Sequence, residues 1–198
     1  MKRLLTLVIG ILLIVGSASA QGKFGIKGGL NYDSFNPTIS SFEDQIKTAT
    51  GFHAGFLYRI KVPFIGLAIQ PELLYSQKNT EVFAEQNVTD DLSLGYLEVP
   101  LNLQMGIDLI FLRPYVQITP YVSYAIMKGG SLFNEIPWDD INRFDYGLGL
   151  GAGIELWKLQ VSGKYNWSLN SFTGSGEIQN LIGAPKFKGF QLSVAFLF

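Results

Sequence analysis

Long stretches of strictly alternating side chains constrain this chain more than any other feature of its sequence. Eight segments alternate an apolar residue with a polar or small one, at residues 23–32, 51–61, 66–77, 94–108, 113–127, 145–156, 159–169 and 187–198. Alternation over about ten residues is typical of strands that cross a membrane, whereas strands of soluble proteins are most often about five or six residues long. The pattern therefore predicts an all-β chain that spans a membrane.

The connections between these segments alternate in length. Those after the second, fourth and sixth segments are short, at residues 62–65, 110–112 and 157–158, while the other four run over a dozen residues. Such asymmetry is typical of outer-membrane barrels, and only a closed sheet leaves no unpaired backbone in hydrocarbon. We predict an eight-stranded antiparallel up-and-down transmembrane β-barrel with short periplasmic turns and four long external loops.

The first twenty residues have the pattern of a signal peptide. Lys2 and Arg3 precede an apolar run at residues 4–15, and Ala18-Ser19-Ala20 fits the small-residue cleavage pattern. An uncleaved anchor is the alternative, but a spanning helix needs about 20 apolar residues. We therefore expect residues 1–20 to direct export through the Sec pathway and residues 21–198 to form the barrel domain in the outer membrane of a Gram-negative cell.

Composition excludes several classes of chemistry. Cysteine is absent and His53 is the single histidine, so thiolate and multi-histidine metal sites and thiol nucleophiles are ruled out. The formal net charge of −1 provides no basic surface for nucleic acid. We expect no cofactor, no resident metal and no nucleic-acid partner.

The polar faces of the strands carry balanced charges. Three cations and three anions fall on the face that the alternation directs inward: Lys27, Arg59, Lys164, Glu72, Glu98 and Glu155. The interior of an eight-stranded barrel is just wide enough for side chains to fill it. We therefore predict a packed interior with paired charges and no open channel. The glycines at 147, 149, 151 and 153 are expected to make room for Tyr121 and Arg59.

Aromatic residues gather near both ends of the segments, as interfacial girdles do. The expected girdle residues are Phe24, Tyr115, Trp157 and Phe198 on the turn side and Tyr32, Phe52, Tyr75, Tyr124, Tyr146 and Trp167 on the loop side. Phe198 also closes an alternating final segment, which resembles the signal read by the outer-membrane assembly machinery. We expect outer-membrane lipid and that machinery to be partners.

Three prolines, Pro71, Pro100 and Pro120, lie inside expected strands, where each removes a backbone donor, so we expect β-bulges there. They belong to a series of motifs: QPELLYSQ at 70–77, YLEVPLNL at 96–103, RPY at 113–115, TPYV at 119–122 and FDYGLGLGAG at 144–153. In this order the series resembles the PorT-like outer-membrane β-barrel family of Bacteroidota. The resemblance implies an association with a gliding-linked secretion system and brings no catalytic residues.

Candidate chemistry is sparse. His53 is the only histidine that could act as a general base; Asp33, Asp90, Asp91 or Asp145 could orient it, and Ser34 or Ser93 could be the nucleophile. The spacing of these residues is not specific, and we expect His53 to be an ordinary interior or rim histidine. The acidic loops at 33–50 and 78–93 could hold divalent cations or simply be solvated. Loop apolar residues, such as Phe42, Phe83 and Trp138, could form a partner surface.

We expect a non-catalytic integral outer-membrane barrel that acts through its external loops or as an accessory of an envelope or secretion complex, with an envelope protein as its partner. Three alternatives remain open at this stage. They are an enzyme at the barrel rim, a small pore, and a soluble lipocalin-like binder.

Overall fold

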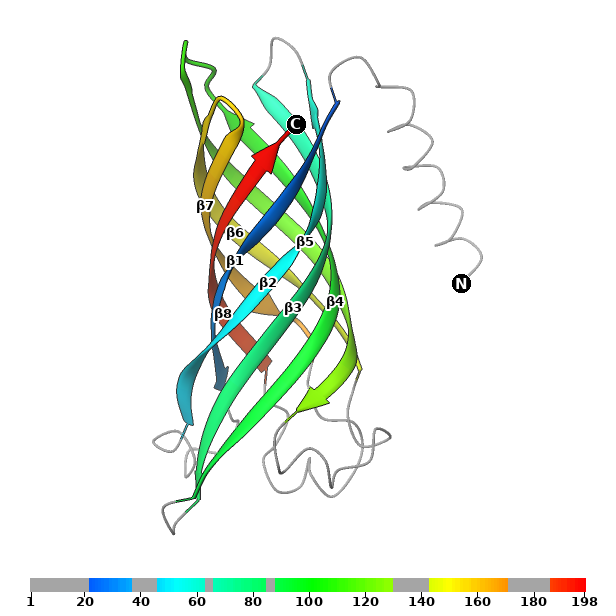
Figure 1. The fold of residues 1–198 in the computed structure, drawn as a ribbon, viewed down its shortest axis with the longest axis vertical. Coiled ribbons are helices and arrows are strands. Elements are labelled where there is room, and N and C mark those ends of the chain that lie inside the picture. The colour runs from blue at the N-terminus through cyan, green and yellow to red at the C-terminus, as the bar shows by residue number, and fades with distance from the viewer. Residues whose placement is uncertain (1–21, 37–45, 63–65, 85–87, 130–142, 171–185) are drawn as a thin grey trace, which may run out of the picture.

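A computed structural model of the chain describes residues 22–36, 46–62, 66–84, 88–129, 143–170 and 186–198. Eight strands make up nearly all of this part: β1 (Gly22–Asn36), β2 (Ile46–Lys61), β3 (Leu67–Ala84), β4 (Val88–Gly106), β5 (Leu112–Gly129), β6 (Phe144–Leu156), β7 (Leu159–Ser168) and β8 (Lys186–Leu197). Each strand pairs antiparallel with its neighbours in sequence, and β8 returns to pair with β1 (Figure 1). The predicted closed, eight-stranded antiparallel barrel is confirmed. No helix in the described residues is long and apolar enough to cross a membrane.

Closure joins the two ends of the chain. Gly25 pairs with Leu197, and the Phe198 N–H donates a 2.8 Å hydrogen bond to the Phe24 carbonyl. The start of β1 and the C-terminus therefore lie at the same end of the barrel (Figure 1), as an even number of strands requires. This end also carries the three short turns, and we call it the turn end. The opposite end is called the loop end.

The barrel is apolar outside and polar inside. Outward side chains such as Phe56 and Val194 are 55% and 53% exposed, whereas inward ones such as Gln70 and Asn102 are 2% and 0% exposed. Successive residues of a strand point to opposite faces, so the alternation of the sequence becomes this radial separation. An apolar outer surface around a polar interior is suited to lipid rather than water.

The second external connection differs from its prediction. Residues 78–84 and 88–93, which we expected in a long loop, belong to β3 and β4 and pair out to Ala84 and Val88. The alternation stops at residue 77 because the next residues are mostly polar on both faces, yet the backbone continues as a β-hairpin. The three connections at the turn end are short, as predicted. The remaining external connections lie mostly outside the described residues.

The bulges predicted at the prolines were wrong. The register does not change at Pro71, Pro100 or Pro120, which stay paired with Leu101, Tyr121 and Leu148 of the following strand. Pairing with the preceding strand instead skips each proline together with the residue before it. In an antiparallel ladder a residue directs its N–H to one neighbour only, so proline interrupts one ladder and leaves the other intact.

Irregular register occurs elsewhere, between Thr48 and His53 of β2 and between Gly95 and Tyr96 of β4.

One of the residues predicted for the aromatic girdle at the turn end does not belong to it. Tyr115 is only 4% exposed and points into the barrel, because it shares the inward parity of Arg113 and Gln117. At the turn end the outward aromatics include Phe24, Trp157 and Phe198, with the Phe24 and Phe198 rings stacked at 6.3 Å.

Candidate functional site

Most of the buried charged and polar side chains of the described residues point into the interior of the barrel. Ten charged side chains are buried there, five of each sign: Lys27, Arg59, Lys78, Arg113, Lys164, Asp33, Glu72, Glu98, Asp145 and Glu155. All six residues of the predicted charge network are among them. The other four lie near strand ends, where the sequence pattern does not distinguish the barrel interior from a loop or turn.

The middle of the barrel is crossed by an ion pair from β1 to β3. Lys27 Nζ donates to both carboxylate oxygens of Glu72, at 2.9 and 3.0 Å, and the two side chains are 3% and 0% exposed. Gln70 Nε2 donates a further 2.8 Å hydrogen bond to Glu72 Oε1. The carboxylate is therefore held by three donor contacts and is removed from water.

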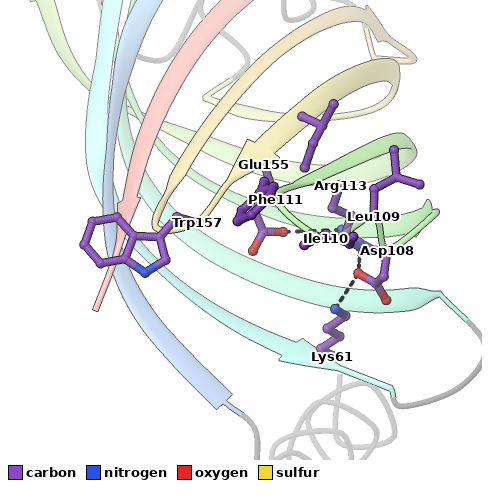
Figure 2. Close-up of a pocket in the computed structure, with 9 residues that line it drawn as sticks. Lys61, Asp108, Leu109, Ile110, Phe111, Arg113, Glu155 and Trp157 are labelled. Atoms are coloured by element: carbon purple, nitrogen blue, oxygen red, sulfur yellow. Dashed lines mark hydrogen bonds and ion pairs between the residues drawn. The ribbon is translucent and has the colours of Figure 1, made fainter.

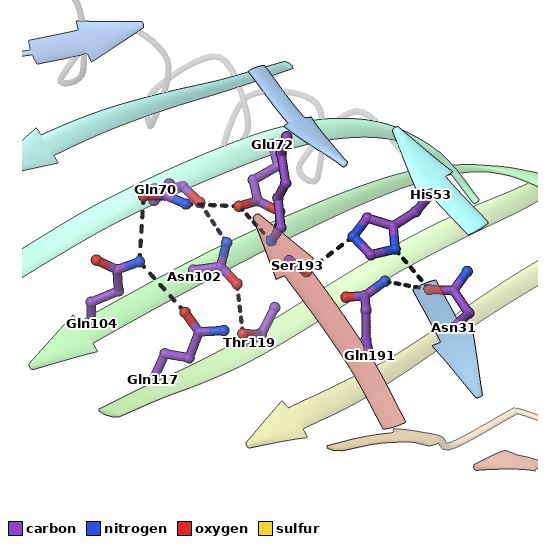
Figure 3. A network of polar contacts seen from close by, with 11 residues as sticks. Asn31, His53, Gln70, Glu72, Asn102, Gln104, Gln117, Thr119, Gln191 and Ser193 are labelled. Atoms are coloured by element: carbon purple, nitrogen blue, oxygen red, sulfur yellow. Dashed lines mark hydrogen bonds and ion pairs between the residues drawn. The ribbon is translucent and has the colours of Figure 1, made fainter. Parts of the chain in front are cut away.

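An uncharged network continues from this pair across β3, β4 and β5 (Figure 3). Gln104 Nε2 donates to the side-chain oxygens of Gln70 and Gln117, at 3.3 and 3.5 Å. Thr119 Oγ1 donates to Asn102 Oδ1 at 2.7 Å, and Asn102 Nδ2 donates to the Gln70 carbonyl at 3.3 Å. These residues were not singled out in the sequence because they carry no charge, although their inward parity places them here.

His53 lies inside the barrel and is 1% exposed. Its Nδ1 is 2.8 Å from Asn31 Oδ1, and its Nε2 is 3.0 Å from Ser193 Oγ (Figure 3). Because Asn31 Oδ1 can only accept, Nδ1 carries the ring proton, and Nε2 accepts from the Ser193 hydroxyl. Serine, histidine and a carbonyl acceptor thus stand in the order of a nucleophile, a base and an orienting group.

The burial of Ser193, His53 and Asn31, which we call the His53 relay, indicates that these residues have a structural role. Asn31 and Ser193 are 2% and 4% exposed, and Gln191 Nε2 donates to Asn31 Oδ1 at 3.0 Å, so packed side chains surround the relay. Of the partners proposed from the sequence, Asp33, Asp145 and Ser93 have described side chains, and none of the three forms a hydrogen bond with His53. Asp33 and Asp145 are buried toward the loop end, and Ser93 Oγ accepts from Gln77 at 2.9 Å. The side chains of Ser34, Asp90 and Asp91 lie outside the described ones.

Toward the loop end, Lys78 is the central cation. Its Nζ is 3.5 Å from Asp145 Oδ2 and lies over the Tyr96 and Tyr121 rings, at 4.9 and 5.7 Å from their centroids. The Ser168 hydroxyl donates to the other oxygen of Asp145. Lys78 had been assigned to an external loop, and its burial follows from the extension of β3.

At the turn end the charges surround the mouth of the barrel (Figure 2). Arg59 forms an ion pair with Glu155. Arg113 Nη1 is 3.8 Å from the other oxygen of that carboxylate. Lys61 Nζ donates to Asp108 Oδ1 at 2.5 Å. This hydrogen bond from Lys61 is the main cause that lowers the pKa of the Asp108 carboxyl below its ordinary value of 3.8. Lys61, Arg113, Glu155 and Trp157, together with residues 108–112 of the β4–β5 turn, line a cavity of about 260 Å³.

Two members of the predicted charge network, Lys164 and Glu98, differ from the others in their polar contacts. Lys164 and Glu98 are 2% and 3% exposed, and among the described residues Lys164 Nζ and Glu98 Oε1 make no hydrogen bond. The aliphatic part of Lys164 instead packs where β6 has no side chain. A Cβ at Gly149 would lie 3.0 Å from Lys164 Cδ, and one at Gly151 would lie 3.0 Å from its Cβ.

The remaining glycines of β6 make room for tyrosines. A Cβ at Gly147 would lie 2.6 Å from Tyr121 Cζ, as predicted, and one at Gly153 would lie 2.6 Å from Tyr115 Cζ. Arg59 is not among the nearest neighbours of any of the four glycines, which corrects the second half of that prediction. Arg59 reaches Glu155 instead.

No group of three or more histidine or acidic side chains among the described residues is arranged to hold a metal ion. Among the acidic residues that we considered as cation ligands, Asp33 is buried inside the barrel, and the side chains of the others, such as Glu43, Asp44 and Glu85, lie outside the described ones.

An apolar exterior, a closed antiparallel sheet and an interior filled by opposed charges define the class of outer-membrane β-barrel proteins. The chain belongs to the family described as outer membrane protein beta-barrel domain, whose sequence profile matches residues 19–174. No curated protein matches its sequence.

Solved barrels show a similar fold at low sequence identity. Neisserial surface protein A is 11% identical, with a TM-score of 0.49, 88% of this chain covered and 97% of that one. OprG from Pseudomonas aeruginosa is 11% identical, with a TM-score of 0.48 and coverage of 90% and 96%. Ail from Yersinia pestis is 13% identical, with a TM-score of 0.46 and coverage of 90% and 99%.

Proposed function

We propose that this protein is a non-catalytic, non-conducting barrel of a Gram-negative outer membrane that presents its external face to an envelope protein, as an accessory of a larger complex. The observation that carries the proposal is the filled interior. Lys27, Glu72 and Asn102 come from different strands and are nearly or fully buried, so side chains occupy the path that an ion would take.

Conduction is disfavoured along the whole axis. Ion pairs span the interior at three levels, between Arg59 and Glu155 at the turn end, between Lys27 and Glu72 in the middle, and between Lys78 and Asp145 toward the loop end. Opening a path would separate opposite charges in a region of low dielectric, which is unfavourable. The barrel is better suited to anchor a structure than to pass a solute.

Catalysis is disfavoured by the same packing. The Ser193–His53–Asn31 relay has the right order of groups but no access for a substrate. A fluorophosphonate probe, which reacts with activated serines, tests this directly on the folded barrel. We expect no labelling of Ser193. Labelling that disappears in both Ser193→Ala and His53→Ala variants would establish an enzyme instead.

The external face offers a built feature that a partner could bind. β3 and β4 have 18 and 19 residues, whereas a tilted strand needs only about 9–11 to cross the bilayer. Their pairing continues out to Ala84 and Val88, and the β3–β4 hairpin projects past the ends of the neighbouring strands (Figure 1). Loops and hairpins supported by a rigid scaffold are common binding sites.

The resemblance to the PorT-like family suggests which complex is involved. It supports a role in protein secretion across the envelope of a member of the Bacteroidota, after Sec-dependent export directed by residues 1–20. Quantitative proteomics of the culture medium, from a deletion strain and its parent, tests this role. Loss of many secreted proteins, restored by the wild-type gene, would support it, and an unchanged secreted set would exclude it.

A hairpin variant makes the experiment specific to the external face. Asn79 pairs with Ser93, so residues 80–92 can be replaced by an Asn-Gly turn while the rest of the barrel keeps its register. We expect this variant to fold, as shown by its heat-modifiable mobility in gels, and to fail to restore secretion. Full restoration would show that the hairpin is not the binding site.

A further inference from the structure

The mouth of the barrel at the turn end carries a surplus cation. Three cations, Arg59, Lys61 and Arg113, meet two carboxylates there, Asp108 and Glu155. Lys61 Nζ is 2.5 Å from Asp108 Oδ1, whereas Arg113 Nε is 3.5 Å from the same oxygen. Glu155 forms its close ion pair with Arg59, and Arg113 Nη1 is 3.8 Å from its other oxygen. Each carboxylate therefore has a closer partner than Arg113, and these five residues, which we call the mouth cluster, hold three positive charges against two negative ones.

The hydrogen bonds of Arg113 agree with this surplus. Its Nη1 donates to Gln104 Oε1 at 3.3 Å and its Nη2 donates to the Gly66 carbonyl at 2.9 Å, so both acceptors are neutral. Within the described part of the chain, Arg113 Nε and the Nε and Nη2 of Arg59 are shielded from water and make no hydrogen bond. One acceptor of the mouth cluster, Glu155 Oε2, is in the same condition. Buried polar groups are normally satisfied, so this excess of charged donors points to an anion.

The two guanidinium groups of the mouth cluster also repel each other. Arg59 and Arg113 are near enough for their charges to interact, and their side chains are 3% and 4% exposed, so water screens this repulsion poorly. An anion bound beside Arg113 would offset the repulsion and neutralise the cluster. The position of Arg113 is fixed in advance, because the Tyr115 ring centroid lies 5.5 Å from its Cζ.

Arg113 borders the cavity of about 260 Å³ at the mouth (Figure 2). Lys61 and Arg113 provide cations to its lining, and the β4–β5 turn provides an apolar wall that includes Leu109, Ile110 and Phe111. Pockets for drug-sized ligands have about 300–1,000 Å³, so this cavity accepts a smaller group, about the size of one amino-acid residue. Its lining suits an anionic group attached to an apolar one.

The charge balance distinguishes between kinds of anion. One negative charge neutralises the mouth cluster, whereas a phosphate dianion would leave a second charge beside the carboxylates of Asp108 and Glu155, which is unfavourable at short range. A carboxylate carries the single charge that is required, and arginine binds carboxylates through charge-assisted hydrogen bonds. The cavity is therefore suited to a carboxylate joined to an apolar side chain.

The surroundings of the cavity indicate where this carboxylate comes from. Ile110 and Phe111 are 91% and 84% exposed, although turns that face water are normally built from glycine, asparagine, aspartate, proline and serine. A free short-chain acid would fill the cavity and leave these side chains uncovered. A polypeptide that ends in the cavity would pass over them, and capture of a terminal carboxylate is a recurrent mode of peptide recognition.

We propose that the cavity at the turn end binds the carboxyl terminus of a periplasmic polypeptide that ends in an apolar residue. Arg113 holds the terminal carboxylate, and the β4–β5 turn contacts the side chain of the last residue. The proposal rests on the orientation given under the proposed function, with the turn end in the periplasm. It does not depend on the external hairpin, so either site can fail without the other.

Trp157 lines the cavity and can report on binding. In a Trp138→Phe/Trp167→Phe background it is the single tryptophan of the chain. The probe is an acetylated pentapeptide of sequence GSGSL, titrated into the purified barrel in detergent with either a free carboxyl terminus or a carboxamide. We expect saturable binding of the acid, with the carboxamide about tenfold weaker or more, because it lacks the charge that Arg113 requires. Equal binding of the two peptides, or no binding of either, would overturn the proposal.

Variants test the role of Arg113. Arg113→Gln removes the surplus charge and should weaken binding of the acid by about tenfold or more, while Arg113→Lys, which keeps the charge, should bind more tightly than Arg113→Gln. Lys23→Gln is the matched control, since it removes the same charge from an exposed residue of β1 at the same end, and it should change the affinity by less than about twofold. An equal loss in Lys23→Gln and Arg113→Gln would show general attraction by the turn end and would refute the assigned site.

Two competitors separate the possible sources of the anion. N-acetyl-leucine should displace the peptide only at higher concentration, because it cannot cover Ile110 and Phe111, and displacement at equal concentration would exclude a polypeptide as the specific occupant. Inorganic phosphate should not displace the peptide, and effective displacement would contradict the preference for a carboxylate. Heat-modifiable mobility confirms that each variant is folded. If Arg113→Gln does not fold, the comparison of the free carboxyl with the carboxamide decides the question.

Discussion

The buried pair between Lys27 and Glu72 allows a quantitative test of how the interior is stabilised. Glu72→Gln removes the negative charge and leaves the Lys27 ammonium, in a side chain 3% exposed, without a counter-ion. Lys27→Met leaves the Glu72 carboxylate, at 0% exposure, with Gln70 as its remaining close donor. Removing one partner of a buried pair costs about 3–5 kcal/mol, so each single variant should be destabilised by that amount.

The double variant Lys27→Met/Glu72→Gln should behave differently. It contains no uncompensated charge at this site, and the new side-chain amide at position 72 can keep the contact with Gln70, so we expect its free energy of unfolding within about 1 kcal/mol of the wild type. The double variant should then be more stable than the sum of the single changes predicts, by about 5 kcal/mol or more. Reversible urea unfolding in lipid vesicles, followed by tryptophan fluorescence, measures all four proteins.

The pair between Lys61 and Asp108 is the matched control, since it has the same chemistry but its side chains are 34% and 47% exposed. Lys61→Met should change the free energy of unfolding by no more than about 1 kcal/mol. The reasoning is refuted if the two single changes at Lys27 and Glu72 are additive in the double variant. It is equally refuted if they cost no more than the change at Lys61.

Three further predictions concern other parts of the barrel. Planar-bilayer recordings of the reconstituted protein should show no steady single-channel conductance, and regular conductance steps would contradict a filled interior. Gly153→Ala should be destabilising by about 1–3 kcal/mol, because the new Cβ would meet the Tyr115 ring and a backbone carbonyl. Gly149→Ala, measured by the same urea unfolding, should cost less because the Cβ meets movable side-chain atoms of Lys164 and Asn166. Since the Lys61 hydrogen bond lowers the Asp108 pKa, the stability that Asp108 provides is fully present above pH 3.8 and lost as the pH falls through the folded-state pKa. The difference in unfolding free energy between wild type and Asp108→Asn should therefore shrink below that pH, and a constant difference would show that the ionised carboxylate is not involved.

The external hairpin shows where sequence reasoning reached its limit. The alternation stops being informative at residue 77, because beyond the membrane neither face of a strand has to be apolar. The continued pairing of β3 with β4 is a backbone property that composition does not reveal. Burial of Lys78 follows from this extension, and so the cation beside Asp145 could not be recognised from its sequence neighbours.

The relay around His53 is a second example. Asn31 and Ser193 are separated from His53 by 22 and 140 positions, and no spacing in the sequence connects the three residues. They meet because closure of the barrel places β8 beside β1. Gly29 of β1 then pairs with His53 of β2 on one side and with Ser193 of β8 on the other. We expected an interior or rim histidine from its place near the loop end of a strand, and His53 is in the interior, where the register determines its neighbours.

The sequence by itself determined the class of fold and the face on which each strand residue lies. The reason is local, because successive side chains of a strand point to opposite sides whatever their neighbours are. Only the tertiary structure decided which inward residues meet. Lys27 reaches Glu72 and Arg59 reaches Glu155 across the barrel, while within the described part of the chain Lys164 Nζ and Glu98 Oε1 make no hydrogen bond. Strand register and closure set these distances, and both arise from hydrogen bonding around the whole sheet, which no segment specifies alone.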